Sequence, residues 1–387
     1  MTSPVNSRLV TWSGVGAVAV FAAIGGAWIF RLPSAPNITA APSIAKEETD
    51  ATLALLKPTK RQRPLVAIVG INNATEVTDY LMPYGILRRA DVADVRLLAT
   101  EPGPVELYPA LRVEPDETIA EFDAQHPEGA DFVIVPAMSR DDDPAVLAWL
   151  RSQAAGGAMI VGVCAGAKVV ADAGLLDGRR ATTHWYFVEE LRDKHPAIRY
   201  VADRRLVVDQ GVATTTGVTA SMPIALILIE AIAGRDKAEA VARDIGVTHW
   251  DARHGSEAFQ LTRPFALTAI GNTMRFWERE RLGIELTPDV DEVSLALVAD
   301  AWSRTYRSRA VTFSRTAEAL RSRNGIRILP DQVAASWPVE HLLPAVGDRP
   351  PARALDETLD EIRTRYGVPT SDFVAMQLEY PGAGASR

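Results

Sequence analysis

The pattern of hydrophobic and polar positions predicts strands that alternate with helices. Residues 64–70 form a continuous apolar run, which is typical of a central parallel strand buried on both faces. Further strands are predicted at 95–99, 132–135 and 159–163, a late hairpin at 206–208 and 212–214, and helices at 75–90, 144–155 and 221–233. This alternation predicts an α/β fold with a doubly wound parallel sheet, in which ligands bind beyond the carboxyl ends of the strands.

The most distinctive motif lies at the end of the strand predicted at 159–163. It reads Gly162-Val163-Cys164-Ala165-Gly166 and runs into a helix of small residues. A strand that turns this sharply into a helix leaves no room for bulk on either side, so the two glycines predict a nucleophile elbow with Cys164 at its tip. The N-terminus of the following helix would favour the thiolate. The alternative is a buried cysteine that acts as a small hydrophobic residue.

The N-terminal region contains a long apolar segment. Leu9–Phe30 has 22 residues and no ionisable side chain, with Arg8 and Arg31 on its flanks. This length predicts a transmembrane anchor; a cleaved signal peptide is the alternative. We therefore expect a single-pass protein of a bacterial inner membrane, anchored through residues 9–30. The short N-terminal flank favours a periplasmic soluble part, but Arg8 and the amino terminus oppose Arg31, so the opposite orientation stays open.

The C-terminal region echoes an earlier part of the chain. An acidic residue, a helix, a strand and a further polar-apolar segment occur in the same order over 75–116 and over 291–331. The offset is 216 at the first of these features (292 − 76) and 215 at the last (331 − 116). We interpret this as a partial β-α-β repeat without a second elbow, although two generic β-α-β segments could resemble each other by coincidence. The predicted organisation is an anchor at 1–31, a tether at 32–63, the main domain at 64–250 and a helical region with the partial repeat at 251–387.

Composition narrows the possible chemistry. The chain of 387 residues is 47% hydrophobic and carries a net charge of −8, so nucleic acid is a poor default partner. Cys164 is the only cysteine, and the six histidines do not show the spacing of a helical zinc site. We expect no metal and no cofactor.

Two kinds of side chain could assist Cys164. His184 follows it by twenty positions (184 − 164) and is a candidate base, although it could equally be a core histidine bonded to backbone carbonyls. Asp79 lies early in the first predicted helix and could donate a proton to sulfur or substrate, with Glu76 one turn earlier as the competing candidate. For either acid, the alternative is a helix-start residue favoured by the dipole.

These residues together resemble the ThiJ/PfpI superfamily, with its flavodoxin-like, class I glutamine-amidotransferase-like fold. The similarity rests on Gly162 to Gly166 and on the string A-G-L-L-D-G-R-R-A-T-T-H-W that ends at Trp185. It is nearest to the isocyanide-hydratase branch and to the amidase-like domain of bacterial transcriptional regulators. The resemblance implies that Cys164 is the nucleophile, that His184 is its neighbour and that Asp79 is the carboxyl group beside the sulfur. It also implies homodimers.

The sequence departs from the family pattern at two places. Where the family usually has Pro-Gly-Gly, this chain has Pro136-Ala137-Met138, so the oxyanion hole implied by the resemblance would use the backbone N–H groups of Ala165 and Met138. The acid that the family carries after a late Ser/Gly-rich turn is absent from 215–223. The related regulators continue into a helix-turn-helix domain, but this tail resembles a second partial copy of the fold, so DNA binding is not implied.

Three functions are compatible with these features. The first is a cysteine-dependent enzyme that hydrates or hydrolyses a small electrophilic molecule. The second is a ligand- or redox-sensing module that has lost turnover, since an exposed reactive thiol oxidises readily. The third is a structural or interaction protein that uses the fold as a scaffold.

Overall fold

A seven-stranded sheet forms the centre of the protein. The computed structural model describes residues 26–35, 41–347 and 349–380. The strand order is β11-β12-β8-β7-β1-β3-β6, and every neighbouring pair is parallel except β11 and β12. The strands are β1 (Leu65–Gly70), β3 (Asp94–Ala99), β6 (Glu117–Thr118), β7 (Phe132–Val135), β8 (Met159–Gly162), β11 (Leu206–Asp209) and β12 (Val212–Thr215). The predicted α/β fold with a mostly parallel sheet is confirmed.

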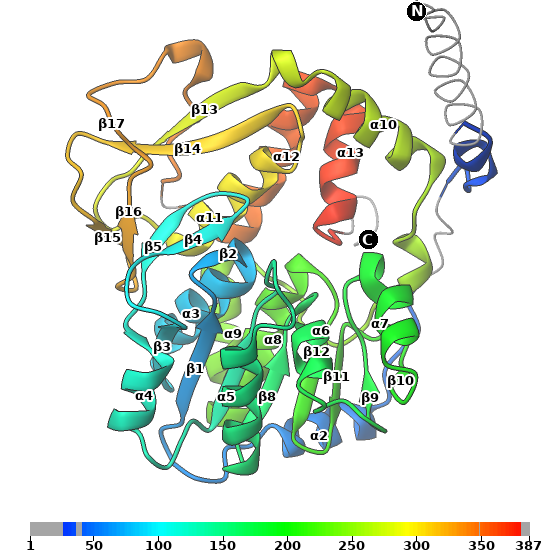
Figure 1. Cartoon of the computed structure of the whole chain (residues 1–387), viewed down its shortest axis with the longest axis vertical. Helices are drawn as coiled ribbons and strands as arrows, with labels where there is room; N and C mark the ends of the chain where they lie inside the picture. Colours follow the sequence, from blue (N-terminus) through cyan, green and yellow to red (C-terminus); the bar gives the residue numbers. More distant parts are fainter. Residues whose placement is uncertain (1–25, 36–40, 348, 381–387) are drawn as a thin grey trace, which may run out of the picture.

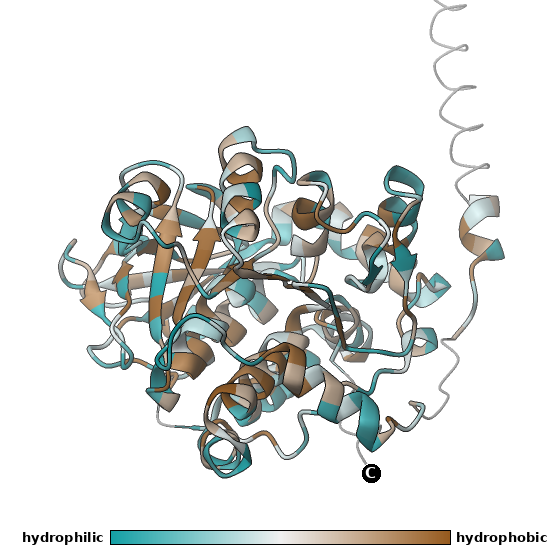
Figure 2. Ribbon diagram, turned by 90° about the horizontal axis from the view of Figure 1, so that it is seen from below, coloured by the Kyte–Doolittle hydropathy of each residue, from teal (hydrophilic) through white to brown (hydrophobic). Residues whose placement is uncertain are grey.

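Helices cover both faces of this sheet. One face carries α3 (Val77–Ala90), α8 (Ser221–Ala233) and α9 (Arg235–Ile245), and the other carries α4 (Ile119–Gln125), α5 (Pro144–Ala155) and α6 (Gly166–Asp172). Alternate residues of β1 enter the two cores, with Val66 and Ile68 in one and Ala67 and Val69 in the other. The apolar strands lie between the helix layers (Figure 2). This explains why β1 is a continuous apolar run.

The predicted elements agree closely with the observed ones. The strand at 132–135 and the helices at 144–155 and 221–233 have the predicted bounds, and the late hairpin is antiparallel. The helix predicted from residue 75 begins at Val77, because residues 73–76 form β2 (Asn73–Glu76). The side chain of Glu76 caps the helix by accepting the N–H of Asp79. A small parallel pair of β9 (Arg180–Ala181) and β10 (Arg199–Tyr200) flanks α7 (Val188–Lys194).

The predicted single-pass membrane localisation is contradicted. No helix among the described residues is long and apolar enough to cross a membrane. The predicted anchor lies mostly outside the described residues, and of its described end, residues 26–31 are helical. Part of the predicted tether packs on the main unit: α2 (Lys46–Leu55) contacts α8, and its Glu48 accepts hydrogen bonds from Arg204 at 2.6 and 3.0 Å.

The C-terminal region forms a second layer above the first (Figure 1). Its parallel sheet has the order β13-β14-β17, and α11 packs between this sheet and α3. Two further helices, α12 and α13, pack beside α11 and α10. The elements are α10 (Arg263–Met274), β13 (Glu280–Glu285), α11 (Glu292–Ser303), β14 (Ser308–Ser314), β17 (Gln332–Val333), α12 (Pro351–Tyr366) and α13 (Val368–Gln377).

From α3 and α11 onward, this region repeats the start of the main unit at an offset of 215. The first strand pair is shifted by one residue, since Leu65 pairs with Asp94 whereas Glu280 pairs with Ser308. The pairs Leu98–Glu117 and Phe313–Gln332 are equivalent (313 − 98 and 332 − 117), and so are Val105–Val113 and Leu320–Ile328. A shared sheet of order β15-β16-β5-β4-β2 joins the two copies. Its remaining strands are β4 (Val105–Tyr108), β5 (Arg112–Glu114), β15 (Leu320–Arg321) and β16 (Arg327–Leu329). We call residues 280–333 the half-repeat.

Candidate functional site

Cys164 lies at the tip of a strained turn between β8 and α6. Its φ of +57° is in the left-handed region, which non-glycine residues rarely adopt. A Cβ on Gly166 would lie 1.9 Å from the carbonyl oxygen of Val135, and one on Gly162 would lie 3.0 Å from the backbone of Ala167. Close backbone approach therefore requires a glycine at 166 and leaves little room for a side chain at 162, and the turn has the geometry of a nucleophile elbow.

Threonine hydroxyls hold this turn in place. The backbone N–H of Cys164 donates to Oγ1 of Thr215 at 3.2 Å, and Oγ1 of Thr183 donates to the carbonyl of Cys164 at 3.0 Å. Thr215 ends β12, the strand next to β8, while Thr183 follows β9. The elbow is thus fixed from two sides by residues far from it in sequence.

Asp79 is fully buried near the thiol. Its carboxylate accepts the backbone N–H of Ala137 at 3.1 Å and the hydroxyl of Ser221 at 3.3 Å. Burial, and next the negative charge of Glu76, raise the pKa of Asp79 well above its usual range, against the N–H of Ala137. Asp79 therefore holds its proton at a pH where an exposed aspartate has lost it.

Glu76 is fixed from the opposite side by the half-repeat. One carboxylate oxygen accepts the hydroxyl of Thr78 and the N–H of Asp79, each at 2.7 Å. The other accepts Nη2 of Arg304 at 2.7 Å, and the same guanidinium donates to Asp300, also at 2.7 Å. Glu76 is therefore a helix cap and an ion-pair partner of Arg304. Of the two acids, Asp79 has the larger electrostatic effect on the pKa of Cys164.

The environment of the thiol differs from the expectation that a helix N-terminus would favour thiolate. Burial raises the pKa of Cys164 well above its usual value, and the charges of Asp79, Glu76 and Glu379 act in the same direction. The backbone N–H of Ala165 opposes them by hydrogen bonding to the sulfur.

His184 is hydrogen-bonded to backbone groups at both ring nitrogens. Nδ1 accepts the N–H of Tyr186 at 3.2 Å, so Nε2 carries the proton and donates it to the carbonyl of Gln377 at 2.9 Å. Burial lowers the pKa of His184, although Glu379 opposes this. The histidine is therefore neutral and joined to the C-terminal segment, not directed at the sulfur as a base.

Glu379 was missed by reasoning from the sequence. It is 3% exposed, and its carboxylate accepts the N–H groups of Trp185 at 2.6 Å and Gly217 at 2.8 Å. An acid was judged absent from the turn at 215–223, yet the chain end supplies one to that turn from 162 residues away. No local sequence signal marks Glu379, because only the path of α13 brings it here (Figure 1).

The expected oxyanion segment is partly committed to other contacts. The N–H of Ala137 is bonded to Asp79, and its carbonyl accepts the N–H of Glu76 at 2.9 Å. Met138 forms an isolated bridge with Thr75. The Ala165 N–H lies at the sulfur, so it is placed to serve an oxyanion there, while the role of Met138 stays a prediction.

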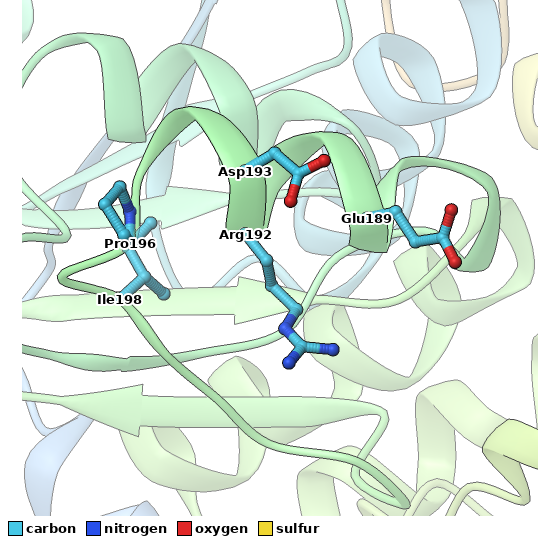
Figure 3. A pocket seen from close by; sticks show the side chains of 5 residues that line it. All are labelled: Glu189, Arg192, Asp193, Pro196 and Ile198. Carbon is cyan, nitrogen blue, oxygen red and sulfur yellow. The ribbon is translucent and has the colours of Figure 1, made fainter.

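The described residues contain no group of three or more His, Cys, Asp or Glu side chains that could hold a metal. A surface hollow on α7 is lined by Glu189, Arg192, Asp193, Pro196 and Ile198 (Figure 3). Its charged side chains all come from α7, and no thiol lines it. The enclosed cluster around Cys164 is therefore the candidate site.

Comparisons with known proteins agree with this geometry. The profile of the DJ-1/PfpI family matches residues 66–231. Isonitrile hydratase of Pseudomonas putida is 32% identical over 168 residues, which cover 42% of this chain and 70% of that protein. The HTH-type transcriptional regulator CdhR of Pseudomonas aeruginosa is 27% identical over 210 residues, 53% of this chain and 59% of the regulator.

Among solved structures, Drosophila melanogaster DJ-1beta is similar over 48% of this chain and all of its own, with 24% identity and a TM-score of 0.44. The predicted resemblance to the ThiJ/PfpI superfamily is confirmed by the family match and by the isonitrile hydratase. Together with the cysteine elbow, these matches show that the chain belongs to the DJ-1/PfpI family.

Proposed function

We propose that Cys164 is the nucleophile of an enzyme that adds water to a small electrophilic molecule. The observation that carries the proposal is the strained elbow, which holds the sole cysteine beside a carboxyl group that keeps its proton. A nucleophile and a proton donor in one enclosed site are the two groups that such an addition needs. The predicted main domain at 64–250 supplies both.

An isonitrile is the substrate class that we propose first, because a hydratase of isonitriles is 32% identical to this chain. Sulfur forms a bond to the isonitrile carbon, and the thiol proton, relayed by Asp79, ends on that same carbon. Water then adds to the resulting thioimidate, the carbon–sulfur bond breaks, and the thiol recovers a proton. The net reaction is isonitrile plus water to an N-substituted formamide, with no oxidant or reductant required.

The test is turnover of small alkyl isonitriles by the purified protein, with formamide quantified by mass spectrometry. We expect many turnovers per protein, and loss of at least about a thousandfold in Cys164→Ser, since the covalent step is then removed. Asp79→Asn should lower the rate by roughly a hundredfold. Absence of formamide across the isonitrile panel, with Cys164 unmodified, would overturn the proposal.

A second candidate, a ligand- or redox-sensing module, is favoured by the similarity to the transcriptional regulator CdhR. Such a site would take up one ligand or one oxidation equivalent and would not turn over. Mild peroxide followed by mass spectrometry distinguishes the two, because a sensor gives a stable sulfenic or sulfinic Cys164. DNA binding is not part of either proposal. A homodimer would need a surface other than α3, which α11 already covers.

A further inference from the structure

The interface between α3 and α11 is reciprocal. Arg304, at the C-terminal end of α11, pairs with Glu76 at the start of α3, while Arg89, near the end of α3, pairs with Asp291 at the start of α11. Both equivalences have the offset of the half-repeat (304 − 89 and 291 − 76 are 215). The two helices therefore exchange the same ion pair in both directions.

The strands that join the two copies also pair through equivalent residues. Val113 of β5 pairs with Ile328 of β16, and the two residues are again equivalent (328 − 113 is 215). Reciprocal contact between equivalent residues is the property of an isologous interface, which two copies of one surface form about a two-fold axis. The half-repeat thus occupies the position of a second copy of the α3 face, within one chain.

The two ion pairs differ in their surroundings. Arg89 also pairs with Asp244 at 2.8 Å, and the side chain of Asp244 is 60% exposed. Arg304 lies between Asp300, which is fully buried, and Glu76, whose other oxygen binds the N–H of Asp79. Of these two ion pairs, the one formed by Arg304 is hydrogen-bonded, through Glu76, to the backbone of Asp79 in the thiol site.

We propose that the half-repeat acts as a built-in partner subunit and that Arg304 is its positioning residue for the thiol site. Its guanidinium pairs with Glu76, and Glu76 in turn fixes the first turn of α3, which carries Asp79. The same positive charge offsets the negative charge of Glu76 at Cys164. The inference deepens the proposed function and rests on it for its biological meaning.

The charges around both groups set the sign of the expected effect. Arg304 faces Glu76 and Asp300, and burial raises the pKa of Asp300 to about 7. Cys164 is influenced by Asp79, Glu76 and Glu379. Removing the guanidinium leaves the Glu76 charge unbalanced and disfavours the thiolate, whereas removing the Glu76 charge leaves the guanidinium in excess and favours it.

The experiment is a titration of the Cys164 thiol by NMR in the full chain. Cysteine labelled with ¹³C at Cβ gives a single protein signal, because there is one cysteine. In Arg304→Gln we expect the thiol pKa to rise by roughly half a unit or more, and in Glu76→Gln to fall by a similar amount. Arg304→Lys, which retains the charge, should stay near the wild-type value.

Arg89→Gln is the matched control, since it removes the equivalent ion pair from the same interface without touching the site. It should leave the thiol pKa unchanged. Equal titration curves for Arg304→Gln and Arg89→Gln would overturn the inference. If Arg304→Gln does not fold, Glu76→Gln decides, and a thiol pKa that does not fall refutes the charge balance.

The outcome is separate from that of the proposed function, because the titration needs no turnover. An absence of isonitrile hydration with the predicted pKa shifts rejects the proposed substrate and retains the role of Arg304. Hydration with unchanged thiol titration in every variant retains the proposed function and rejects the role of Arg304.

Discussion

Asp79 and Cys164 are two buried acidic groups that influence each other electrostatically, and their protonation is the main property of the site. The fold raises the pKa of each, so it favours their neutral forms. A carboxyl group with a raised pKa in the folded state stabilises the fold at low pH and loses that contribution as the pH rises. Asp79 thus costs stability at neutral pH.

Asp79→Asn tests this cost. The unfolded aspartate ionises near its usual value of 3.8, while the folded one does so at a higher pH. The variant should therefore be close to wild type in melting temperature at pH 3 and increasingly more stable than wild type as the pH rises above 3.8, until the folded group also ionises. Calorimetry of both proteins from pH 3 to neutrality measures the difference; a difference that shrinks with pH would contradict the raised pKa.

Some residues of the site could be predicted from the sequence and others could not. Cys164, Asp79 and Glu76 could be selected from the sequence because each lies next to a strand end, where a parallel sheet gathers its ligands. Glu379 could not, since it reaches the site from the end of the chain. His184 was identified as a neighbour, but its bonds to Tyr186 and Gln377 became visible only in three dimensions.

At the scale of elements, the β8–α6 elbow depends on a glycine that touches backbone. The contact of 1.9 Å between an added Cβ on Gly166 and the carbonyl of Val135 involves no flexible side chain that could move away. The turn therefore cannot accept even alanine without a shift of β7 or α6. This makes the elbow a property of the strand packing as much as of its own sequence.

Gly166→Ala should accordingly lower the free energy of unfolding by about 3 kcal/mol or more, because backbone overlap must be relieved. Gly271→Ala in α10 is the matched control: its Cβ would meet nothing within 4 Å and its φ is ordinary. That helical substitution should stabilise by about 0.5–1 kcal/mol. Urea unfolding of both variants measures the difference, and similar stabilities would show that the elbow tolerates bulk.

The bounds of many strands and helices are determined by local features of the sequence. Strand and helix bounds such as 132–135 and 144–155 follow from apolar period and caps, which are local. The repeat was also visible in the sequence, although its first feature was misaligned by one residue. Glu76 corresponds to Asp291 and not to Glu292, because both Glu76 and Asp291 cap their helices.

At the scale of the whole molecule, the main unit and the half-repeat share one hydrophobic core. Leu295 and Leu297 of α11 belong to the same buried cluster as Leu81 and Leu87 of α3. A continuous core predicts cooperative unfolding of both parts. The half-repeat is therefore not an appended module, and the site depends on it.

Leu295→Ala tests this cooperativity. Leu295 is fully buried in α11, so the substitution should cost about 2–5 kcal/mol. We expect scanning calorimetry to show one transition for the main unit and the half-repeat together, shifted to lower temperature in the variant. Two transitions, of which only one shifts, would show that the half-repeat unfolds independently.

The sequence by itself determined the sheet, its helices, the elbow at Cys164 and the existence of a repeat, because these depend on local periodicity, close packing of small residues and similarity along the chain. It could not determine that Arg304 and Glu379 complete the site, nor that the thiol is surrounded by negative charge. Those features arise from contacts between segments more than a hundred residues apart, such as Glu76 with Arg304 and Gly217 with Glu379. Burial then fixes the protonation of Asp79 and Cys164, and burial is a property of the folded chain alone.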